Sequence, residues 1–313
     1  MPPTATPRRV RRAAEGARSA TMAALTARTR RGRATSTAFL GIMLVGLSFA
    51  LVGLLSLIVF MFVEGGGRLS WTLLTEGPST INPGGAGYRP AILGTLWVIS
   101  GVIMLIVPLG VGSAIYLERY ASKDRWWNRL IELNIQNLAG VPSIVFGILG
   151  LAFVARGPLG LGFVAIAGSI TVAMLVLPTV ILAAREAIKA VPSSISDGAM
   201  ALGATQWQTT RRQVLPIALP GILTGVILAV ARAIGEAAPL LLVGAVNFIT
   251  FDPTFTSRYT TLPVLIYNYS TRPQEEFRVL AAAGVIIMLV LVLAMNSVAV
   301  WLRNHFETKY REH

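Results

Sequence analysis

Residues 185–239 read REAIKAVPSSISDGAMALGATQWQTTRRQVLPIALPGILTGVILAVARAIGEAAP. The first part of this stretch is polar and helix-prone, and the second part is an apolar helix that carries Arg232 and Glu236 four residues apart. The other long apolar segments of the chain keep charged residues out. Placing an arginine or an acidic group at the centre of a membrane span costs about 2.5 to 3.5 kcal/mol on insertion scales. We therefore expect this pair to have a function.

The whole chain is too apolar for an ordinary soluble domain. Of its 313 residues 54% are hydrophobic and 13% are charged, whereas soluble domains have about 25% charged residues. A membrane-spanning helix needs about 20 apolar residues. Six segments meet this length, which predicts an all-α membrane protein with six transmembrane helices in a domain over 38–302: 38–63, 91–117, 133–155, 161–184, 216–246 and 279–302.

The positions of Lys and Arg predict the orientation. Most of them lie in the tail 1–37, the loop 118–132, the loop 185–215 and the tail 303–313. By the positive-inside rule these segments are cytoplasmic, so both termini face the cytoplasm from the plasma (inner) membrane. The Arg-rich tail 1–37 lacks apolar periodicity and is expected to be disordered. Its charge, part of a net charge of +13, indicates contact with anionic lipid head groups rather than nucleic acid.

Several kinds of chemistry are not expected. The chain has no cysteine, and its two histidines, His305 and His313, lie in the C-terminal tail. We therefore predict no catalytic centre and no metal site. No G-x-x-x-x-G-K-[ST] loop for nucleotide phosphates is present, so any ATPase that drives this protein is a separate subunit.

The loop 185–215 contains a spaced motif. Asp197-Gly198-Ala199 is followed by Gly203 and then by Gln213-Val214-Leu215-Pro216. The pattern resembles the EAA loop of type I (MetI-like) ABC importer permeases, although Asp197, Gly198 and Gln213 replace the usual Glu, Ala and Ile. Ser and Asp side chains over 193–197 are expected to cap a short helix of small residues. The alternative is an amphipathic helix at the lipid head groups.

The resemblance implies a role for this loop. In the family, the loop is the coupling helix that seats on a cytoplasmic ATPase subunit, with a glycine making the turn between its halves. The matching residues here are Asp197, Gly198, Ala199, Leu202 and Gly203.

The following helix adds a second resemblance. Ala231-Arg232-Ala233-Ile234-Gly235-Glu236 is similar to phosphate-specific permeases of the PstA and PstC type, as are the stretches 138–145 and 262–267. The resemblance covers roughly residues 91 to 302. It implies that Arg232 and Glu236 matter for translocating inorganic phosphate. Glu186 falls at a position that is also acidic in PstA-type proteins, and it is a second-tier candidate for a functional residue. A solvated loop charge remains the alternative for Glu186.

The same resemblance implies the partners. They are a PstC-like permease in a heterodimer, a PstB-like ATPase dimer that uses ATP and Mg, and a PstS-like extracytoplasmic phosphate-binding protein. No cofactor is expected on this chain itself. Two alternatives stay open: a related importer for another solute, such as sulfate or an amino acid, and a membrane component of phosphate sensing or signalling.

The chemistry of the pair fits an anion. The planar guanidinium of Arg232 matches phosphate oxygens, and Glu236 would hold it in place and keep the site from trapping its ligand. Pro239 is expected to loosen the helix beside Glu236. The alternative is a salt bridge that only fixes helix register. In the Gly- and Pro-rich third span, Ser143 would either line the pathway or serve helix packing.

Overall fold

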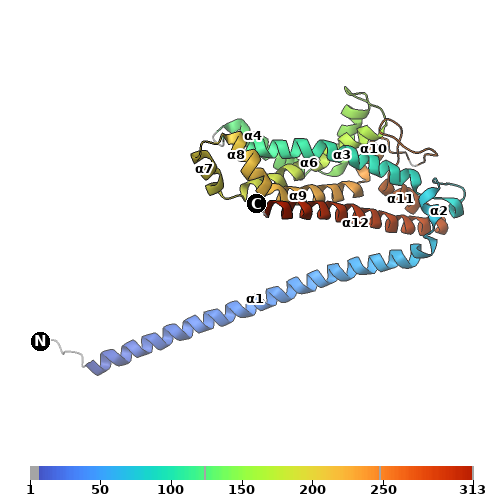
Figure 1. Cartoon of the computed structure of the whole chain (residues 1–313). Coiled ribbons are helices and arrows are strands. Elements are labelled where there is room, and N and C mark those ends of the chain that lie inside the picture. The colour runs from blue at the N-terminus through green and yellow to red at the C-terminus, as the bar shows by residue number, and fades with distance from the viewer. Residues whose placement is uncertain (1–6, 123–124, 247, 312–313) are drawn as a thin grey trace. The chain divides into compact units, whose positions relative to one another are not determined.

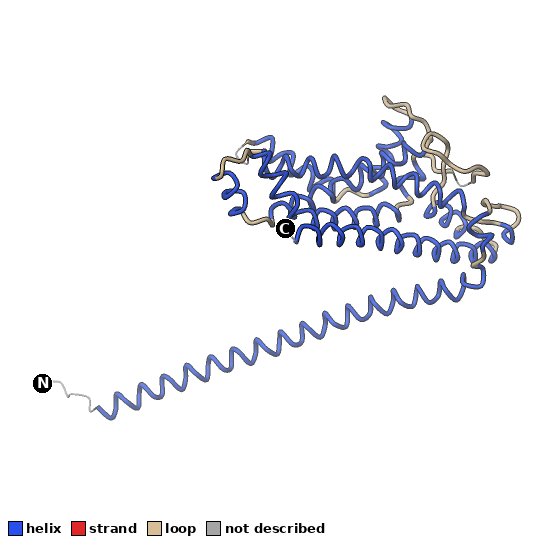
Figure 2. Tube along the Cα trace, viewed as in Figure 1, coloured by secondary structure: helices blue, strands red, loops and turns tan. Residues whose placement is uncertain are grey.

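A computed structural model describes residues 7–122, 125–246 and 248–311, with side chains from residue 36 to 305 apart from the same gaps. In this part of the chain, helices are joined by loops and no strand occurs (Figures 1 and 2). The chain divides into two units, 1–60 and 61–313. The first unit holds most of helix α1 (Pro7–Gly65).

Helix α1 differs from the expectation for the N-terminal tail. We expected disorder over 1–37, but the helix begins at Pro7, and residues 1–6 lie outside the described part. Alanine and arginine, which dominate this segment, are strong helix formers and can extend a helix without any packing partner. The apolar part of α1, Ser36–Arg68 with its short 3₁₀ continuation, is long enough to cross a membrane.

The second unit contains all the other helices. They are α2 (Trp71–Thr75), α3 (Arg89–Ile115), α4 (Trp126–Ala139), α5 (Ser143–Leu149), α6 (Ala165–Lys189), α7 (Ser193–Ala201), α8 (Gln206–Thr209), α9 (Leu215–Gly235), α10 (Ala238–Leu242), α11 (Leu262–Ser270) and α12 (Glu275–Arg311). Three π-helical segments extend them: η3 (Tyr116–Tyr120), η4 (Gly150–Ala155) and η5 (Thr210–Val214).

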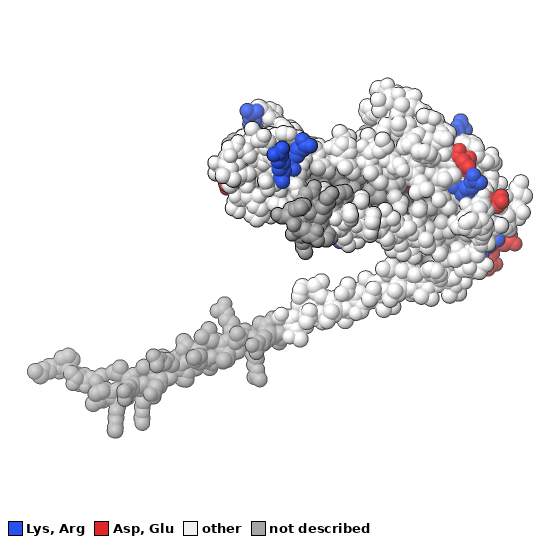
Figure 3. All heavy atoms as spheres, in the orientation of Figure 1, with Lys and Arg blue, Asp and Glu red and all other residues white. Residues whose placement is uncertain are grey.

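The predicted spans correspond to these helices. Among the residues that the structure describes, five helical segments are long and apolar enough to cross a membrane. A sixth span results if the bent pair formed by α4 and by α5 with η4 is counted as one. The chain is therefore an all-α membrane protein. On the face shown in Figure 3, Lys and Arg side chains stand at the end of the second unit that carries α7 and α8, and charges of both signs stand at the opposite end.

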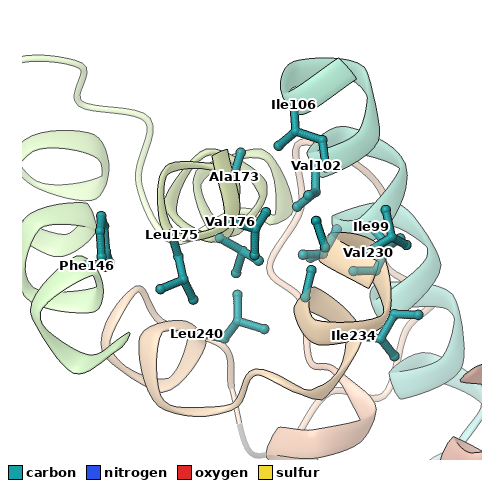
Figure 4. Close-up of a cluster of buried hydrophobic side chains, with 14 of the residues drawn as sticks. Ile99, Val102, Ile106, Phe146, Ala173, Leu175, Val176, Val230, Ile234 and Leu240 are labelled. Atoms are coloured by element: carbon teal, nitrogen blue, oxygen red, sulfur yellow. The ribbon is translucent and has the colours of Figure 1, made fainter. Parts of the chain in front are cut away.

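Helix α6 forms the centre of the second unit. It packs against α3 and α9, and the main apolar cluster lies where these helices meet (Figure 4). Small residues allow close approach: a Cβ on Gly225 of α9 would lie 2.4 Å from Cβ of Ala183 in α6. The cluster includes Ile99, Val102, Ile106, Phe146, Leu175, Val176, Val230, Ile234 and Leu240.

Two of the predicted spans are not continuous helices. The third, expected over 133–155, starts earlier at Trp126 and bends by 109° between α4 and α5. Val141 precedes Pro142, and a residue before proline is pushed out of the helical region. The fifth, expected over 216–246, stops at Gly235; Glu236 is extended (φ −77°, ψ 117°) before the short α10. The expected loosening beside Glu236 is thus a complete break.

The loop 243–261 is fastened to the N-terminal ends of two spans. The backbone N–H groups of Ala165 and Ile166, at the start of α6, donate to the carbonyl oxygens of Ser257 and Phe255. The N–H of Leu262 donates to Oγ1 of Thr95 in α3, with the two atoms 2.9 Å apart. These bonds satisfy backbone groups that a helix leaves unpaired at its start. The loop is therefore part of the packed unit.

Candidate translocation and coupling sites

The ion pair predicted from the sequence is present, and it spans the break in the fifth span. Nε of Arg232 lies 3.4 Å from Oε1 of Glu236, and the two side chains are 46% and 16% exposed. Arg232 belongs to the last turn of α9, whereas Glu236 follows the end of the helix. In a continuous helix the separation of residues i and i+4 is fixed by helix geometry. Here it also depends on the conformation of the break.

Arg232 faces away from the core of its own chain. Leu228, Arg232 and Gly235 are exposed and lie on one side of α9, while Ala229 and Val230 on the other side are buried in the main cluster. This division follows the 3.6-residue period of the helix. Within the second unit, the guanidinium thus lies on the exposed side of α9, away from the main apolar cluster.

The short helices that follow the breaks in the third and fifth spans pack against one another. A Cβ added to Gly147 of α5 would be 2.7 Å from Cα of Pro239 in α10, so the two short helices touch through their backbones. Val141 and Ala237, one at each break, both pack against the main apolar cluster. Ser143 is the first residue of α5, one turn before Gly147, and is partly buried. The structure therefore places Ser143 at the bend of the third span.

The loop predicted to couple to an ATPase forms two short helices. α7 begins at Ser193 after Pro192, and no side chain caps it. The expected capping by Ser or Asp side chains over 193–197 is wrong, because Pro192 occupies the cap position and residues 193–197 all lie inside the helix. The chain turns at Gly203, whose φ of +87° is in the left-handed region that favours glycine. A capping box then starts α8: the side chain of Thr205 accepts from N–H of Gln208, and the Gln208 side chain accepts from N–H of Thr205.

The predicted coupling residues are presented on the outside of this loop. Asp197, Gly198 and Gly203 are exposed, and Ala199 is partly exposed. Leu202, at the tip beside the turn, is 91% exposed.

One charged cluster was missed by the sequence reasoning. Glu186 is exposed near the end of α6, but its neighbour Arg185 points inward and forms ion pairs with Glu132 of α4 and Glu118 of η3. All three residues lie at ends of predicted spans on the predicted cytoplasmic side, and that shared position was the available signal. Among the side chains that the structure describes, no three His, Asp or Glu residues gather in a way that could hold a metal ion.

Residues 106–312, more than half of the chain, match the family described as "Binding-protein-dependent transport system inner membrane component". The chain belongs to this family. Members of this permease family named as phosphate transporters are among its relatives: the phosphate transport system permease protein PstA of Yersinia pestis is 33% identical over 260 residues, which cover 82% of this chain and 87% of that protein.

A second relative and a solved structure are also similar to the chain. The probable ABC transporter permease protein YqgI of Bacillus subtilis is 30% identical over 280 residues, covering 85% of this chain and 93% of YqgI. A chain of the bacterial alginate ABC transporter, solved in complex with a pentasaccharide-bound periplasmic protein, superposes with a TM-score of 0.65 over 85% of this chain at 14% identity. At that identity the superposition shows a shared permease fold.

Proposed function

We propose that this chain is the permease subunit of an ATP-driven importer that moves inorganic phosphate across the plasma membrane. The observation that carries the proposal is the exposed guanidinium of Arg232, held by one ionic contact to Glu236 across the break after α9. The relatives named PstA support phosphate as the solute. Both termini and the loop around α7 face the cytoplasm, in accord with the positive-inside rule.

The binding step uses the donor geometry of arginine. The guanidinium of Arg232 offers a planar fork of N–H donors that matches two oxygens of a phosphate. Glu236 competes for the same donors. Glu236 holds Arg232 by a single contact of 3.4 Å, so an incoming anion can displace the carboxylate from the guanidinium. When the carboxylate returns, the anion is released, as a transport site requires.

The break makes this exchange depend on conformation. A movement of α10, together with the α5 helix packed on it, changes the distance between Glu236 and Arg232, because Glu236 connects α9 to α10. Broken helices at mid-membrane commonly form such sites, since freed backbone groups need a polar pathway rather than lipid. Ser143, at the neighbouring bend, is the polar side chain placed to line the same pathway.

The proposed transporter contains three further kinds of subunit. A second, PstC-like permease covers the exposed side of α9, and a PstS-like phosphate-binding protein delivers the solute. A PstB-like ATPase dimer, using ATP and Mg, seats on α7 through Asp197, Gly198, Ala199, Leu202 and Gly203. The turn between α7 and α8 at Gly203 and the exposed side chain of Leu202 beside it support this docking. Glu186, exposed next to the loop, is assigned a secondary role there.

The test is uptake into proteoliposomes that contain the whole complex. Arg232→Gln and Glu236→Gln should each lower ATP-dependent phosphate uptake by about tenfold or more, equivalent to about 1.4 kcal/mol, with the complex assembled normally. Arg232→Lys keeps the charge but loses the fork, so it should be only partly active. Arg278→Gln, an exposed arginine on α12, is the matched control and should transport at the wild-type rate.

The contrary results are specific. If both glutamine variants assemble and take up phosphate at the wild-type rate, the pathway role of the pair is wrong. If the wild-type complex accumulates sulfate or an amino acid but no phosphate, the solute is wrong. Intact phosphate signalling without any flux would favour the sensing role instead.

A further inference from the structure

A partly buried arginine joins three helices at the predicted cytoplasmic end of the second unit. Nη2 of Arg185, near the end of α6, lies 2.9 Å from Oε1 of Glu132 in α4 and 3.6 Å from Oε2 of Glu118 in η3. The side chains of Arg185 and Glu118 are only 14% and 11% exposed. One guanidinium thus connects α6, α4 and the end of α3.

The segment η3, where Glu118 lies, is connected to the coupling loop (residues 185–215) at both ends of that loop. α6 ends at Lys189, one turn after Arg185, and α7 begins four residues later. After the loop, the side-chain amide of Gln206 in α8 donates to the carbonyl oxygen of Arg119, the residue next to Glu118. The segment between α6 and α8 is therefore held to η3 by Arg185 before it and by Gln206 after it.

The helices at this end are not all connected in the same way. A buried apolar cluster joins α3, α6, η5 and α9 through Ala114, Ala184, Ile188, Val214, Ala218 and Ile222. In the described part of the chain, α4 contributes no member to this cluster. Movements of the loop pass to α3, α6 and α9 through this apolar packing. Helix α4 packs along α6, and at this end it is held by two polar contacts, the ion pair of Glu132 with Arg185 and the hydrogen bond from Nδ2 of Asn128 to the carbonyl oxygen of Ser122.

We propose that Arg185 is a positioning residue that transmits movement of the coupling loop to α4, and through α4 to the bend before Ser143. This inference rests on the proposed transport function and adds a residue outside the substrate pathway. Arginine suits the task because its fork can bind two carboxylates at once and does not lose its charge. A purely structural clamp would affect assembly or stability and would leave the ratio of transport to hydrolysis unchanged.

The first experiment measures that ratio in proteoliposomes with the complete transporter. Glu132→Gln and Arg185→Gln should lower the phosphate accumulated per ATP hydrolysed by about fivefold or more, the lower range of typical coupling energies. The double variant should be no worse than the more affected single variant, because both changes remove one interaction. Lys189→Gln, an exposed charge one turn further along α6, is the control and should match the wild type.

The second experiment follows α4 directly and does not depend on transport. The chain has no cysteine, so two spin labels can be placed at introduced cysteines, one at the exposed Gln136 of α4 and one at the exposed Tyr267 of α11. ATP binding to the assembled complex should change the distance between the labels. In Glu132→Gln the change should disappear.

The outcomes separate the two proposals. A ratio within twofold of the wild type in both single variants, or an unchanged label movement in Glu132→Gln, would overturn the role of Arg185. Additive losses in the double variant would do the same. If Arg185→Gln fails to assemble, Glu132→Gln still decides, because that side chain is 42% exposed. If the wild-type complex shows no phosphate uptake while its labels move with ATP, the transport proposal fails and the mechanical one stands.

Discussion

Gly147 of α5 lies so close to Pro239 of α10 that a Cβ at position 147 would be 2.7 Å from Cα of Pro239 and 2.8 Å from Cδ1 of Leu242. The neighbour is backbone, so it cannot move aside by changing a rotamer. This contact joins the helix that follows the bend in the third span to the helix that follows the break in the fifth span. The position of Glu236 therefore depends on it.

Gly147→Ala should push α5 away from α10. We expect a loss of about 1 to 3 kcal/mol in stability, as for other overpacked cores, measured by thermal unfolding in detergent. Gly112→Ala in α3 is the matched control, because nothing lies within 4 Å of the added Cβ; alanine there should be neutral or stabilise the helix by up to about 1 kcal/mol. Equal stability of the two variants would contradict the close contact.

Gly203→Ala should strain the elbow between α7 and α8. The φ of +87° at this position is unfavourable for any residue with a Cβ, at a cost of about 1 to 2 kcal/mol. We expect the loop to change conformation and the amount of ATPase that copurifies with the complex to fall. Gly198→Ala, inside α7 and open on its surface, should not disturb the fold of the loop. Normal ATPase recovery with Gly203→Ala would argue against a rigid elbow.

Leu202→Glu should weaken ATPase binding without affecting the fold. The side chain is 91% exposed, so it contributes little to the packing of this chain, whereas a buried charge in a partner's groove is costly. Affinity for the ATPase, measured by titration of the reconstituted subunits, should fall by about tenfold or more. Ile81→Glu is the control, because Ile81 is 93% exposed and lies in the loop before α3. A fall of the same size for both variants would mean that Leu202 is not a docking residue.

The folded protein should become less stable at alkaline pH because the phenol of Tyr269 is buried. Burial raises the pKa of the Tyr269 phenol to about 12, compared with about 10 in the unfolded chain. Between these values the unfolded state loses the phenolic proton while the folded state keeps it, so stability falls as pH rises from about 10 to 12, by at most about 1.4 kcal/mol per pH unit.

The measurement is the unfolding temperature at pH 9 and pH 11. Tyr269→Phe removes the group, so its unfolding temperature should fall less between the two values than that of the wild type. Tyr267→Phe is the control, because Tyr267 belongs to the same helix α11 but is 54% exposed; it should behave like the wild type. Identical pH dependence of wild type and Tyr269→Phe would show that the buried phenol does not contribute.

Features carried by local sequence were predictable. The apolar segments predicted the spans, because span length depends on a run of adjacent residues. The turn at Gly203 was implied by the resemblance of the loop to the EAA loop, and glycine suits its left-handed φ. The closeness of the Arg232 and Glu236 side chains was predictable for a similar reason, because the two residues are four positions apart in the sequence. The start of α7 at Ser193 was not, since several Ser residues and Asp197 were equally able to cap a helix.

Features that depend on distant residues were not predictable. Arg185 meets Glu132, 53 positions earlier, only because α4 and α6 pack together. Gly147 of α5 meets Pro239 of α10 in the same way, although the two residues lie far apart in the sequence. A single sequence contains no record of such pairings, so the proline could indicate a kink but not its angle of 109°.

The backbone bonds that tie Ser257 and Phe255 to the start of α6 have a thermodynamic consequence for molecular recognition. A loop whose backbone is already hydrogen-bonded to the rest of the fold has little conformational entropy left to lose. A protein that binds at residues 248–261 would therefore form its contacts without the entropic cost of ordering a flexible segment. Association there would be governed by shape and charge, and its rate would resemble that of rigid partners rather than that of coupled folding and binding.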